Sequence, residues 1–267
     1  MITRLISEAR KIVLKFGSNT LSSQAEFQGG TINTSLLDEF AVQISDLVKA
    51  GKQIVIVSSG AQAAGLSTLN KWARKKDIHY RQALCAVGQV ELMNAWGRAF
   101  DKSGIHIAQI LLTQDDFGDS IRTLNMRNTL FTLVDEGIIP VINENDTVSV
   151  EEIKIGDNDT LAAQSAILWS ADLLVLFSDI DGLYTKNPKE FPDAKLVEKV
   201  TNIEAARKGV VIGSPNALGT GGIATKIAAA ERVLPYGIST IITNGSRPRA
   251  LEALAAGKQQ GTAFVAG

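Results

Sequence analysis

The chain has 267 residues, of which 45% are hydrophobic and 21% charged, a globular balance that allows one large domain or two small ones. Its formal net charge of -1 gives no overall attraction for nucleic acid or for an anionic membrane surface. No stretch approaches the ~18 apolar residues of a membrane span, and the N-terminus lacks the apolar core of a signal peptide, so we expect a soluble, cytoplasmic protein.

The first predicted strand, Lys11 to Phe16, carries a lysine near its end. Lys15 is followed closely by Gly17-Ser18-Asn19, and a glycine there lets backbone N–H groups approach a phosphate closely. Ammonium groups are rarely buried without a partner. Lys15 is therefore either a phosphate-binding residue or an edge lysine whose ammonium reaches out to water.

A helix is predicted over Asn33 to Gly51, and a second buried strand over Gln53 to Val57. That strand runs into Ser58-Ser59-Gly60-Ala61, where the next helix is expected to begin. A strand, a small polar turn and a helix N-terminus form an anion-binding arrangement. Many such loops bind nothing, so this signal is weak by itself.

A polar and basic surface loop is expected over Leu69 to Tyr80, followed by a long helix over Arg81 to Lys102. Cys85 in this helix is the single cysteine, which excludes an internal disulfide and fits a reducing compartment. The chain has only two histidines, so no cluster of cysteine and histidine has metal-ligand spacing. Next come a strand over Ile105 to Leu112, a polar connection over Thr113 to Arg122 and a helix over Asn125 to Glu136.

The central stretch of the sequence joins a buried strand, Ile138 to Ile142, to two polar clusters. These clusters are Asn143 to Asp146 and Asp157 to Asp159, and their side chains offer donors and acceptors for a zwitterionic ligand. A strand that opens into polar residues is typical of a site at a sheet edge. Alternatively, both clusters are turns, and the second caps the helix predicted over Thr160 to Trp169.

The last part of the chain contains a buried strand over Asp172 to Phe177 and a glycine-rich segment over Gly213 to Lys226. Ile223 begins a helix with Lys226 in its first turns. This segment is either a phosphate-holding loop with a lysine that neutralises charge, or a flexible linker, and it does not have the P-loop order of residues. A strand over Gly237 to Thr243, a helix over Arg249 to Ala256 and a strand over Thr262 to Val265 complete the chain.

Strands and helices alternate throughout, and several strands are apolar along their whole length. This pattern predicts an α/β fold with a mostly parallel sheet covered on both faces. We interpret it as one fold in two lobes, a substrate lobe over about residues 1–170 and a nucleotide lobe over about 171–267. Lys15 and Lys226 could neutralise a transferring phosphoryl group. A carboxylate acceptor would need no general base, because its pKa of about 4.3 leaves it ionised at neutral pH.

The sequence resembles the amino acid kinase family along nearly its whole length, most closely its glutamate-phosphorylating members. The matching segments are KFGSNTL (15–21), IVIVSSGAQAAG (54–65), CAVGQ (85–89), LLT (111–113), PVINENDTV (140–148), EIKIGDND (152–159), SDIDGLYTKNP (178–188) and LGTGGIATK (218–226). The resemblance implies a three-layer αβα sandwich and transfer of the ATP γ-phosphate to the side-chain carboxylate of L-glutamate, the first step of proline biosynthesis.

The resemblance also implies roles for individual residues. Lys15 and Lys226 look like the lysines on the transferring phosphoryl group, and Asp159 looks like the aspartate that orients them. The glutamate-binding residues would be Ser59, Asp146 and Asn158, with Asp146 facing the substrate ammonium. The ATP-binding residues would be Lys15, Ser178, Asp179, Thr220, Gly221, Gly222, Ile223, Ala224, Thr225 and Lys226. Mg²⁺ is implied by the chemistry, with no protein ligands assigned to it.

Many bacterial members carry an additional C-terminal PUA domain, which we do not find before the chain ends at Gly267. Inhibition by proline and a higher oligomeric state are therefore open, and a homodimer is expected from the resemblance. The reductase that acts on glutamyl phosphate is a possible partner.

Two alternatives to a glutamate-phosphorylating enzyme are an amino acid kinase for another acid, such as N-acetylglutamate or aspartate, and a catalytically silent amino-acid sensor. The presence of Lys15, Asp159 and Lys226 favours catalysis.

Overall fold

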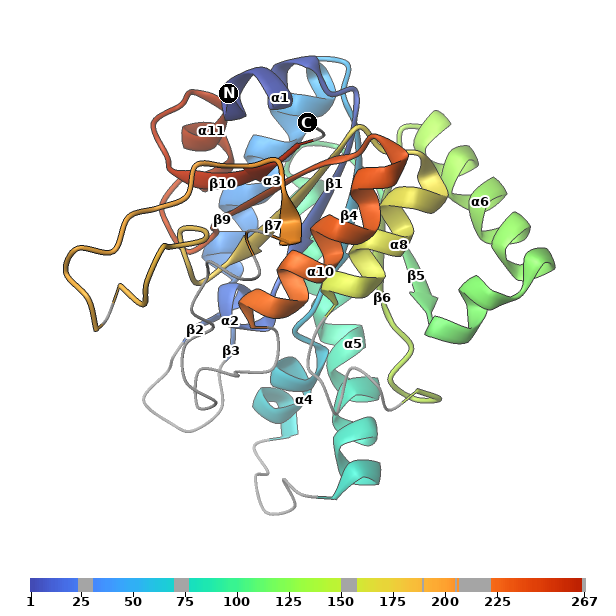
Figure 1. The fold of residues 1–267 in the computed structure, drawn as a ribbon. Helices are drawn as coiled ribbons and strands as arrows, with labels where there is room; N and C mark the ends of the chain where they lie inside the picture. The colour runs from blue at the N-terminus through green and yellow to red at the C-terminus, as the bar shows by residue number, and fades with distance from the viewer. Residues whose placement is uncertain are drawn as a thin grey trace.

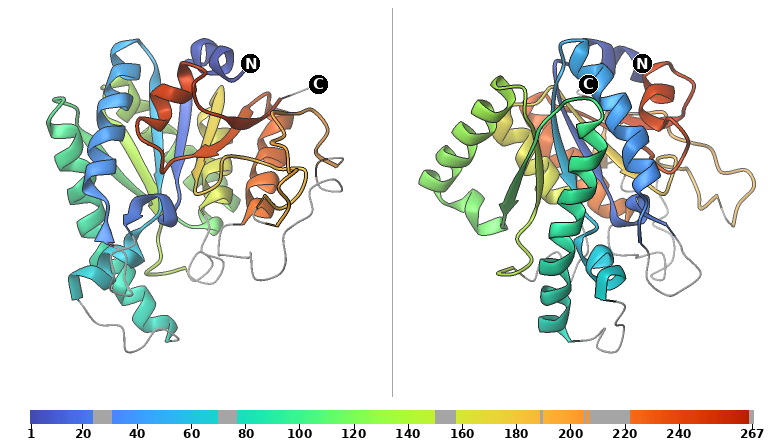
Figure 2. Two further views of the ribbon diagram at one scale, coloured as in Figure 1. Left: turned by 90° about the vertical axis from the view of Figure 1, so that its left-hand side faces the viewer. Right: turned by 180° about the vertical axis from the view of Figure 1, so that it is seen from behind.

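A central β-sheet runs through the molecule with helices on both of its faces, as Figure 1 and the two further views in Figure 2 show. The computed structural model describes residues 1–23, 31–69, 77–149, 158–188, 190–204, 206 and 222–265. Within these residues, no helix is long and apolar enough to span a membrane.

In these described ranges the main sheet has eight strands, in the order β5-β6-β4-β1-β7-β9-β10-β8. Neighbouring strands pair in parallel except β9 and β10, which are antiparallel. The strands are β1 (Lys11–Phe16), β4 (Gln53–Ser58), β5 (Ile107–Leu112), β6 (Ile139–Glu144), β7 (Leu173–Ser178), β8 (Lys199–Val200), β9 (Ser239–Asn244) and β10 (Gly261–Phe264), with a separate small pair β2 (Ser22–Ser23) and β3 (Thr31–Ile32). The predicted mostly parallel sheet is thus confirmed.

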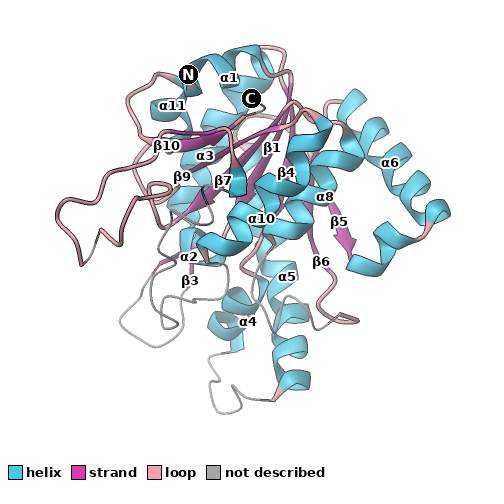
Figure 3. Cartoon of the chain, in the orientation of Figure 1, coloured by secondary structure: helices cyan, strands magenta, loops and turns pink. Residues whose placement is uncertain are grey.

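The helices divide between the two faces, and Figure 3 distinguishes them from the strands by colour. One face is covered by α1 (Ile2–Glu8), α3 (Thr34–Lys49), α5 (Ile78–Asp101) and α11 (Ala250–Ala255). The other is covered by α6 (Ser120–Asp135), α8 (Asp159–Trp169) and α10 (Ile223–Val233). The remaining helical segments are α2 (Ser18–Leu21), α4 (Ala61–Leu69), η1 (Gln114–Gly118) and η3 (Leu234–Tyr236).

The alternation of side chains along β1 decides where its lysine points. Leu14 and Phe16 belong to the core beneath α3 and α5, and Val13 belongs to the core beneath α8 and α10. Successive residues of a strand face opposite sides of the sheet, so Lys15 lies on the same side as Val13. The lysine is therefore directed toward α8 and α10, and it is 2% exposed, which excludes a surface lysine that reaches water.

Several predicted boundaries were wrong, and local caps explain two of them. Helix α5 begins at Ile78 rather than Arg81, because the Asp77 carboxylate accepts from the backbone N–H groups of the next turn, at 3.0 and 3.2 Å. Helix α6 begins at Ser120 inside the predicted polar connection, and Asp119 caps it in the same way. Helix α1 was not predicted, since no side chain caps it.

The first cluster of the central stretch is only partly a turn. Strand β6 continues through Asn143 and Glu144, which pair in register with Leu111 and Leu112 of β5. Only the residues after Glu144 leave the sheet. Residues 150–157 of the stretch lie outside the described part of the chain.

Helices α4 and α5 cross so closely that glycine is required at their contact. A Cβ atom on Gly88 of α5 would lie 1.8 Å from the carbonyl oxygen of Ala61, and one on Gly65 of α4 would lie 1.9 Å from that of Leu84. We expect Gly88→Ala to lower the free energy of unfolding by roughly 1–3 kcal/mol, the usual effect of overpacking. Urea denaturation would measure this change.

Gly97 on the same helix is the matched control, because a Cβ there would meet nothing within 4 Å. Gly97→Ala is expected to stabilise the protein by roughly 0.5–1 kcal/mol, since alanine is the better helix former. Equal effects of the two substitutions would contradict the close crossing.

Candidate active site

Two lysines that are far apart in the sequence meet on one buried carboxylate. Asp159, the first residue of α8, places Oδ1 2.6 Å from Nζ of Lys15 and Oδ2 2.9 Å from Nζ of Lys226. Lys226 lies in the first turns of α10, and Thr225 beside it donates to Oδ2 of Asp159 at 3.0 Å. All three charged side chains are almost completely buried. The structure thus brings together the three residues predicted to be catalytic.

Asp159 lies at the start of α8, where the partial positive charge of a helix N-terminus interacts favourably with a carboxylate. Two ammonium groups around one carboxylate leave one net positive charge in a place with little water. Charges interact more strongly there than in bulk solvent. The arrangement is therefore suited to an anionic group that approaches the lysines.

A cavity of about 220 Å³ lies beside this triad, and Lys15 and Lys226 both line it. The cavity also contains Asp146, Ser178 and Asp179, so five of the predicted site residues share one space. The predicted residues Ser59, Asn158 and Asp159 are buried but do not line the cavity. The predicted ATP-binding residues Thr220 and Gly221 lie outside the described residues.

Asn158 is the end of a chain of hydrogen-bonded side-chain amides that runs through Asn143 and Gln89 to Gln109. Its side-chain nitrogen donates to the Asn143 side-chain oxygen at 2.7 Å, and the Asn143 nitrogen donates to Gln89 at 2.8 Å. Gln89 in turn donates to Gln109 of β5 at 3.3 Å. These bonds fix the orientation of Asn158 immediately before Asp159 of the triad. They assign a positioning role to Asn143, which the sequence placed only in a polar cluster.

Asp146 is one of two acidic residues among the described lining of the cavity, with Asp179, and helix α5 holds the loop that carries Asp146. The side-chain nitrogen of Gln82 donates to the backbone carbonyl of Asp146 at 3.0 Å. Burial raises the pKa of Asp146 to about 7, with a further increase from the charge of Glu144. A hydrogen bond from Cys85 and the charge of Arg81 act in the opposite direction. A bound ammonium group would favour the ionised form of this carboxyl group.

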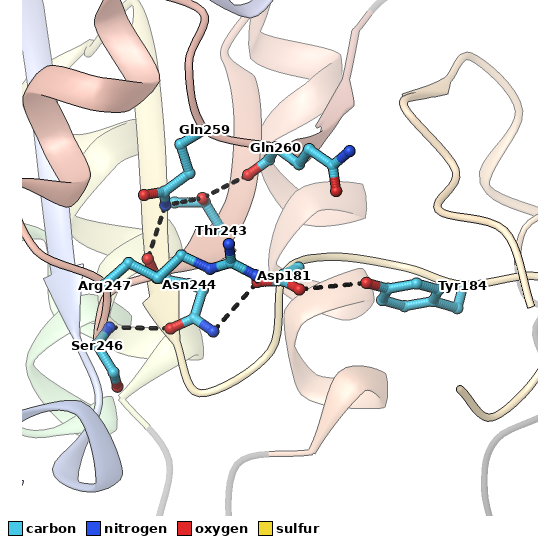
Figure 4. A network of polar contacts seen from close by, with 8 residues as sticks. All are labelled: Asp181, Tyr184, Thr243, Asn244, Ser246, Arg247, Gln259 and Gln260. Carbon is cyan, nitrogen blue, oxygen red and sulfur yellow. Dashed lines mark hydrogen bonds and ion pairs between the residues drawn. The ribbon is translucent and has the colours of Figure 1, made fainter. Parts of the chain in front are cut away.

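Strand β7 ends at Ser178, and the loop that follows it from Asp179 is fixed by a network centred on Asp181 (Figure 4). Asp181 accepts hydrogen bonds from Arg247 at 2.7 Å, from Asn244 at 3.2 Å and from the Tyr184 hydroxyl at 3.2 Å. Gln259 donates to the Asn244 carbonyl and to the Thr243 hydroxyl, both at 2.7 Å, which ties the network to the end of β9.

Gly182 in the same loop has φ +151°, a conformation that L side chains rarely adopt, and a Cβ there would lie 2.5 Å from the Thr262 hydroxyl. The next residue, Leu183, donates its backbone N–H to that hydroxyl at 2.7 Å. The loop is therefore held rigidly against β9 and β10, and it presents Ser178 and Asp179 at a fixed place in the cavity wall.

The sequence profile of the amino acid kinase family matches residues 10–244 of this chain. The chain belongs to the amino acid kinase family.

Two glutamate 5-kinases are similar to this chain over at least 99% of their length. The chain is 59% identical to a glutamate 5-kinase of Alkaliphilus metalliredigens (strain QYMF) over 267 residues, which is 100% of both chains. It is 55% identical to a glutamate 5-kinase of Alkaliphilus oremlandii (strain OhILAs), over 99% of each chain. Its fold resembles that of carbamate kinase from Giardia lamblia bound to AMP-PNP, with a TM-score of 0.68, 17% identity and coverage of 98% of this chain and 100% of that one.

Membership in the amino acid kinase family confirms the fold expected from the sequence, an αβα sandwich with a mostly parallel sheet. The sequence reasoning missed Arg81 and Cys85, which also line the cavity. Residues four positions apart share one face of a helix, and Cys85 opens the family segment CAVGQ. These two signals together could have indicated that this face of α5 meets the site.

Proposed function

We propose that this protein transfers the γ-phosphoryl group of ATP to the side-chain carboxylate of L-glutamate, forming γ-glutamyl phosphate in the first step of proline biosynthesis. The observation that carries this proposal is one cavity that holds both lysines of the triad and the carboxylate of Asp146. The similarity to two glutamate 5-kinases over at least 99% of their length supports the choice of substrate.

In the proposed reaction, a γ-carboxylate oxygen of glutamate forms a bond to the γ-phosphorus of ATP. The bond between that phosphorus and the oxygen that bridges to the β-phosphate breaks, and ADP leaves with the electron pair. Lys15 and Lys226 neutralise the charge that develops on the transferring group. Asp159 holds both ammonium groups in place. No general base is needed, because the attacking carboxylate is already ionised at neutral pH.

Kinases that use ATP need a divalent metal ion, and we propose that it is Mg²⁺ here. Among the described residues no three side chains of the His, Cys, Asp and Glu types gather into a metal site. Mg²⁺ fits such a place, since it usually keeps several waters and binds one or two carboxylates together with substrate phosphates. When bound, the ion would neutralise charge on the β- and γ-phosphates.

The two parts of the chain would divide the work as the sequence suggested. Asp146 and the α4 N-terminus, within about residues 1–170, would bind glutamate, and Ser178, Asp179 and the start of α10 would bind ATP. Gly222 to Lys226 form the N-cap and first residues of α10, where free N–H groups favour phosphate. Every strand in the described residues of both parts belongs to one sheet apart from the small β2–β3 pair, so the lobes share a single framework.

We also infer a cytoplasmic homodimer whose labile acyl phosphate passes to glutamyl phosphate reductase. The dimer and the partner rest on the family resemblance, and the cytoplasmic location rests on the lack of a signal-peptide pattern in the sequence. Light scattering would measure the oligomeric state.

The test of the proposed function is to trap the product of ATP, Mg²⁺ and L-glutamate with hydroxylamine. A γ-glutamyl hydroxamate is expected, because an acyl phosphate transfers its acyl group to this nucleophile. N-acetylglutamate and aspartate serve as alternative acceptors in parallel reactions. A folded protein that gives hydroxamate with neither glutamate nor these acids, yet binds an amino acid, would support the sensor instead.

The KM for glutamate is expected to depend on pH through Asp146. If only the ionised carboxylate binds the substrate ammonium, lowering the pH below the pKa of about 7 removes the binding form. The KM should then rise roughly tenfold for each pH unit below that value and level off above it. Steady-state kinetics between about pH 5.5 and 8.5 would measure this, since glutamate itself keeps its charges in that range.

Asp146→Asn is the matched control for this pH profile. It should raise the KM for glutamate at high pH and make it independent of pH, while the KM for ATP stays unchanged. A wild-type KM that is already flat between these pH values would contradict the role of Asp146.

Arg247→Ala is expected to raise the KM for ATP by about two- to fivefold, the scale of a partly exposed ion pair, and to leave the KM for glutamate unchanged. The substitution removes one donor to Asp181 and loosens the loop that carries Ser178 and Asp179. Arg4→Ala is the control, because it breaks the exposed pair with Glu8 on α1, away from this loop. An unchanged KM for ATP in Arg247→Ala would show that the network does not position the loop.

A further inference from the structure

The first turns of helix α5 form the wall of the cavity nearest to Asp146. Arg81 and Cys85 line the cavity from this helix, and Gln82 between them holds the Asp146 backbone. Helix α5 therefore brings one positive side chain to the same wall as the acidic one. Arg81 lies outside every segment that was predicted from the sequence to bind a ligand.

The guanidinium of Arg81 is fixed by a hydrogen bond at its Nε, and its two terminal nitrogens can donate to a ligand. Its Nε donates to the side-chain oxygen of Gln62 at 3.0 Å, and Gln62 of α4 also lines the cavity. Within the described part of the chain, its two terminal nitrogens donate to no protein acceptor. A guanidinium fixed in this way presents a planar pair of donors that matches a carboxylate.

Among the described residues, three cationic side chains line the cavity, namely Lys15, Lys226 and Arg81. Both lysines are bound to Asp159, on the side where the phosphoryl group would be transferred. Of these three side chains, Arg81 is thus the one that remains for a second negative group. The charge of Arg81 also acts on Asp146, whose pKa it lowers, which shows that the two groups are electrostatically close.

We propose that Arg81 determines specificity by binding the α-carboxylate of the amino-acid substrate, while Asp146 binds the ammonium group on the same carbon atom. This inference rests on the proposed function for the identity of the substrate. The pair would recognise a free α-amino acid as a zwitterion. The side-chain carboxylate would then extend along the cavity toward Lys15 and Lys226. An acid with a blocked or missing α-group would lose one of the two contacts.

The test compares three ligands in wild-type protein and in Arg81→Met. L-Glutamate carries both α-groups, 4-aminobutyrate lacks the α-carboxylate, and glutarate lacks the ammonium. Dissociation constants are measured by ligand-detected NMR titration at about pH 8.5, where Asp146, with a pKa of about 7, is ionised in the wild type. This readout does not require turnover.

Arg81→Met is expected to raise the dissociation constants of glutamate and glutarate by roughly 10- to 100-fold, the usual effect of losing a hydrogen-bonded charge. The dissociation constant of 4-aminobutyrate should change by less than about threefold. Arg81→Lys should recover part of the loss, because the charge remains without the planar fork. Arg98→Met is the control, since Arg98 is an exposed arginine near the other end of the same helix. It should change none of the three constants.

Other outcomes would overturn the proposal. If Arg81→Met raises the dissociation constants of all three ligands equally, Arg81 acts by supporting Gln62 or Asp146. If the dissociation constant of glutamate is unchanged, Arg81 does not contact the substrate. A rise in the KM for ATP alone would assign Arg81 to the nucleotide. Wild-type protein that binds glutamate but forms no hydroxamate would contradict the proposed function, whereas the three-ligand comparison would still decide the role of Arg81.

Discussion

Replacing Lys226 by alanine is expected to lower kcat by roughly 10²- to 10³-fold, the effect of removing one preorganised stabiliser of transition-state charge. The ammonium of Lys226 is 2.9 Å from Asp159 and lines the cavity, so it is fixed before any substrate arrives. The charge on the transferring group grows as the reaction proceeds. Losing this contact should therefore affect kcat more than the KM for either substrate.

The fold should survive this substitution, because Asp159 keeps its ion pair with Lys15 at 2.6 Å. Rates of hydroxamate formation at saturating ATP and glutamate would measure kcat, and circular dichroism would check the fold. Lys258→Ala, at an exposed lysine near the C-terminus, is the matched control and should keep full activity. Wild-type turnover in Lys226→Ala would remove this lysine from the reaction.

Much of the architecture could be predicted from the sequence, because strands buried on both faces are apolar along their length. Strand β1 has the predicted bounds, β4 extends one residue beyond its predicted end, and β7 is shifted by one residue at both of its ends. The errors are at helix starts, where a single carboxylate such as Asp77 or Asp119 decides the first turn. A cap acts locally, but the polar stretch around it resembles a loop, so the sequence alone favoured the later start.

The site was predictable to the extent that its residues belong to family segments, and less so from chemistry alone. The alternation of β1 shows that Lys15 and Val13 share a side, but only the packing of α8 and α10 shows that Asp159 lies between two lysines. The alternative that Asp159 caps α8 is wrong, because Asn158 takes the N-cap position and no side chain makes a cap hydrogen bond there. Asp159 does begin α8, where the helix dipole favours a negative charge, as the same alternative also allowed. Arg81 was missed because a basic residue beside a basic loop resembles an exposed surface.

Asp159→Asn is expected to lower the free energy of unfolding by about 3–5 kcal/mol, the usual effect of breaking a buried ion pair by removing one partner. An asparagine keeps the shape of the side chain but leaves the ammonium groups of Lys15 and Lys226 buried without a negative charge between them. Urea denaturation would measure the loss, and activity should fall at least as far as in Lys226→Ala, since both lysines lose their orientation.

A second substitution separates stability from catalysis in this triad. Asp159→Asn combined with Lys226→Met should regain part of the lost stability, because it removes one of two like charges, and it should regain no activity. Saturating ATP should raise the Tm of Asp159→Asn more than that of the wild type, since the phosphates would supply the missing negative charge to the lysines. An Asp159→Asn protein as stable as the wild type would mean that water reaches the ammonium groups in solution, and the strong electrostatics inferred for the site would then be wrong.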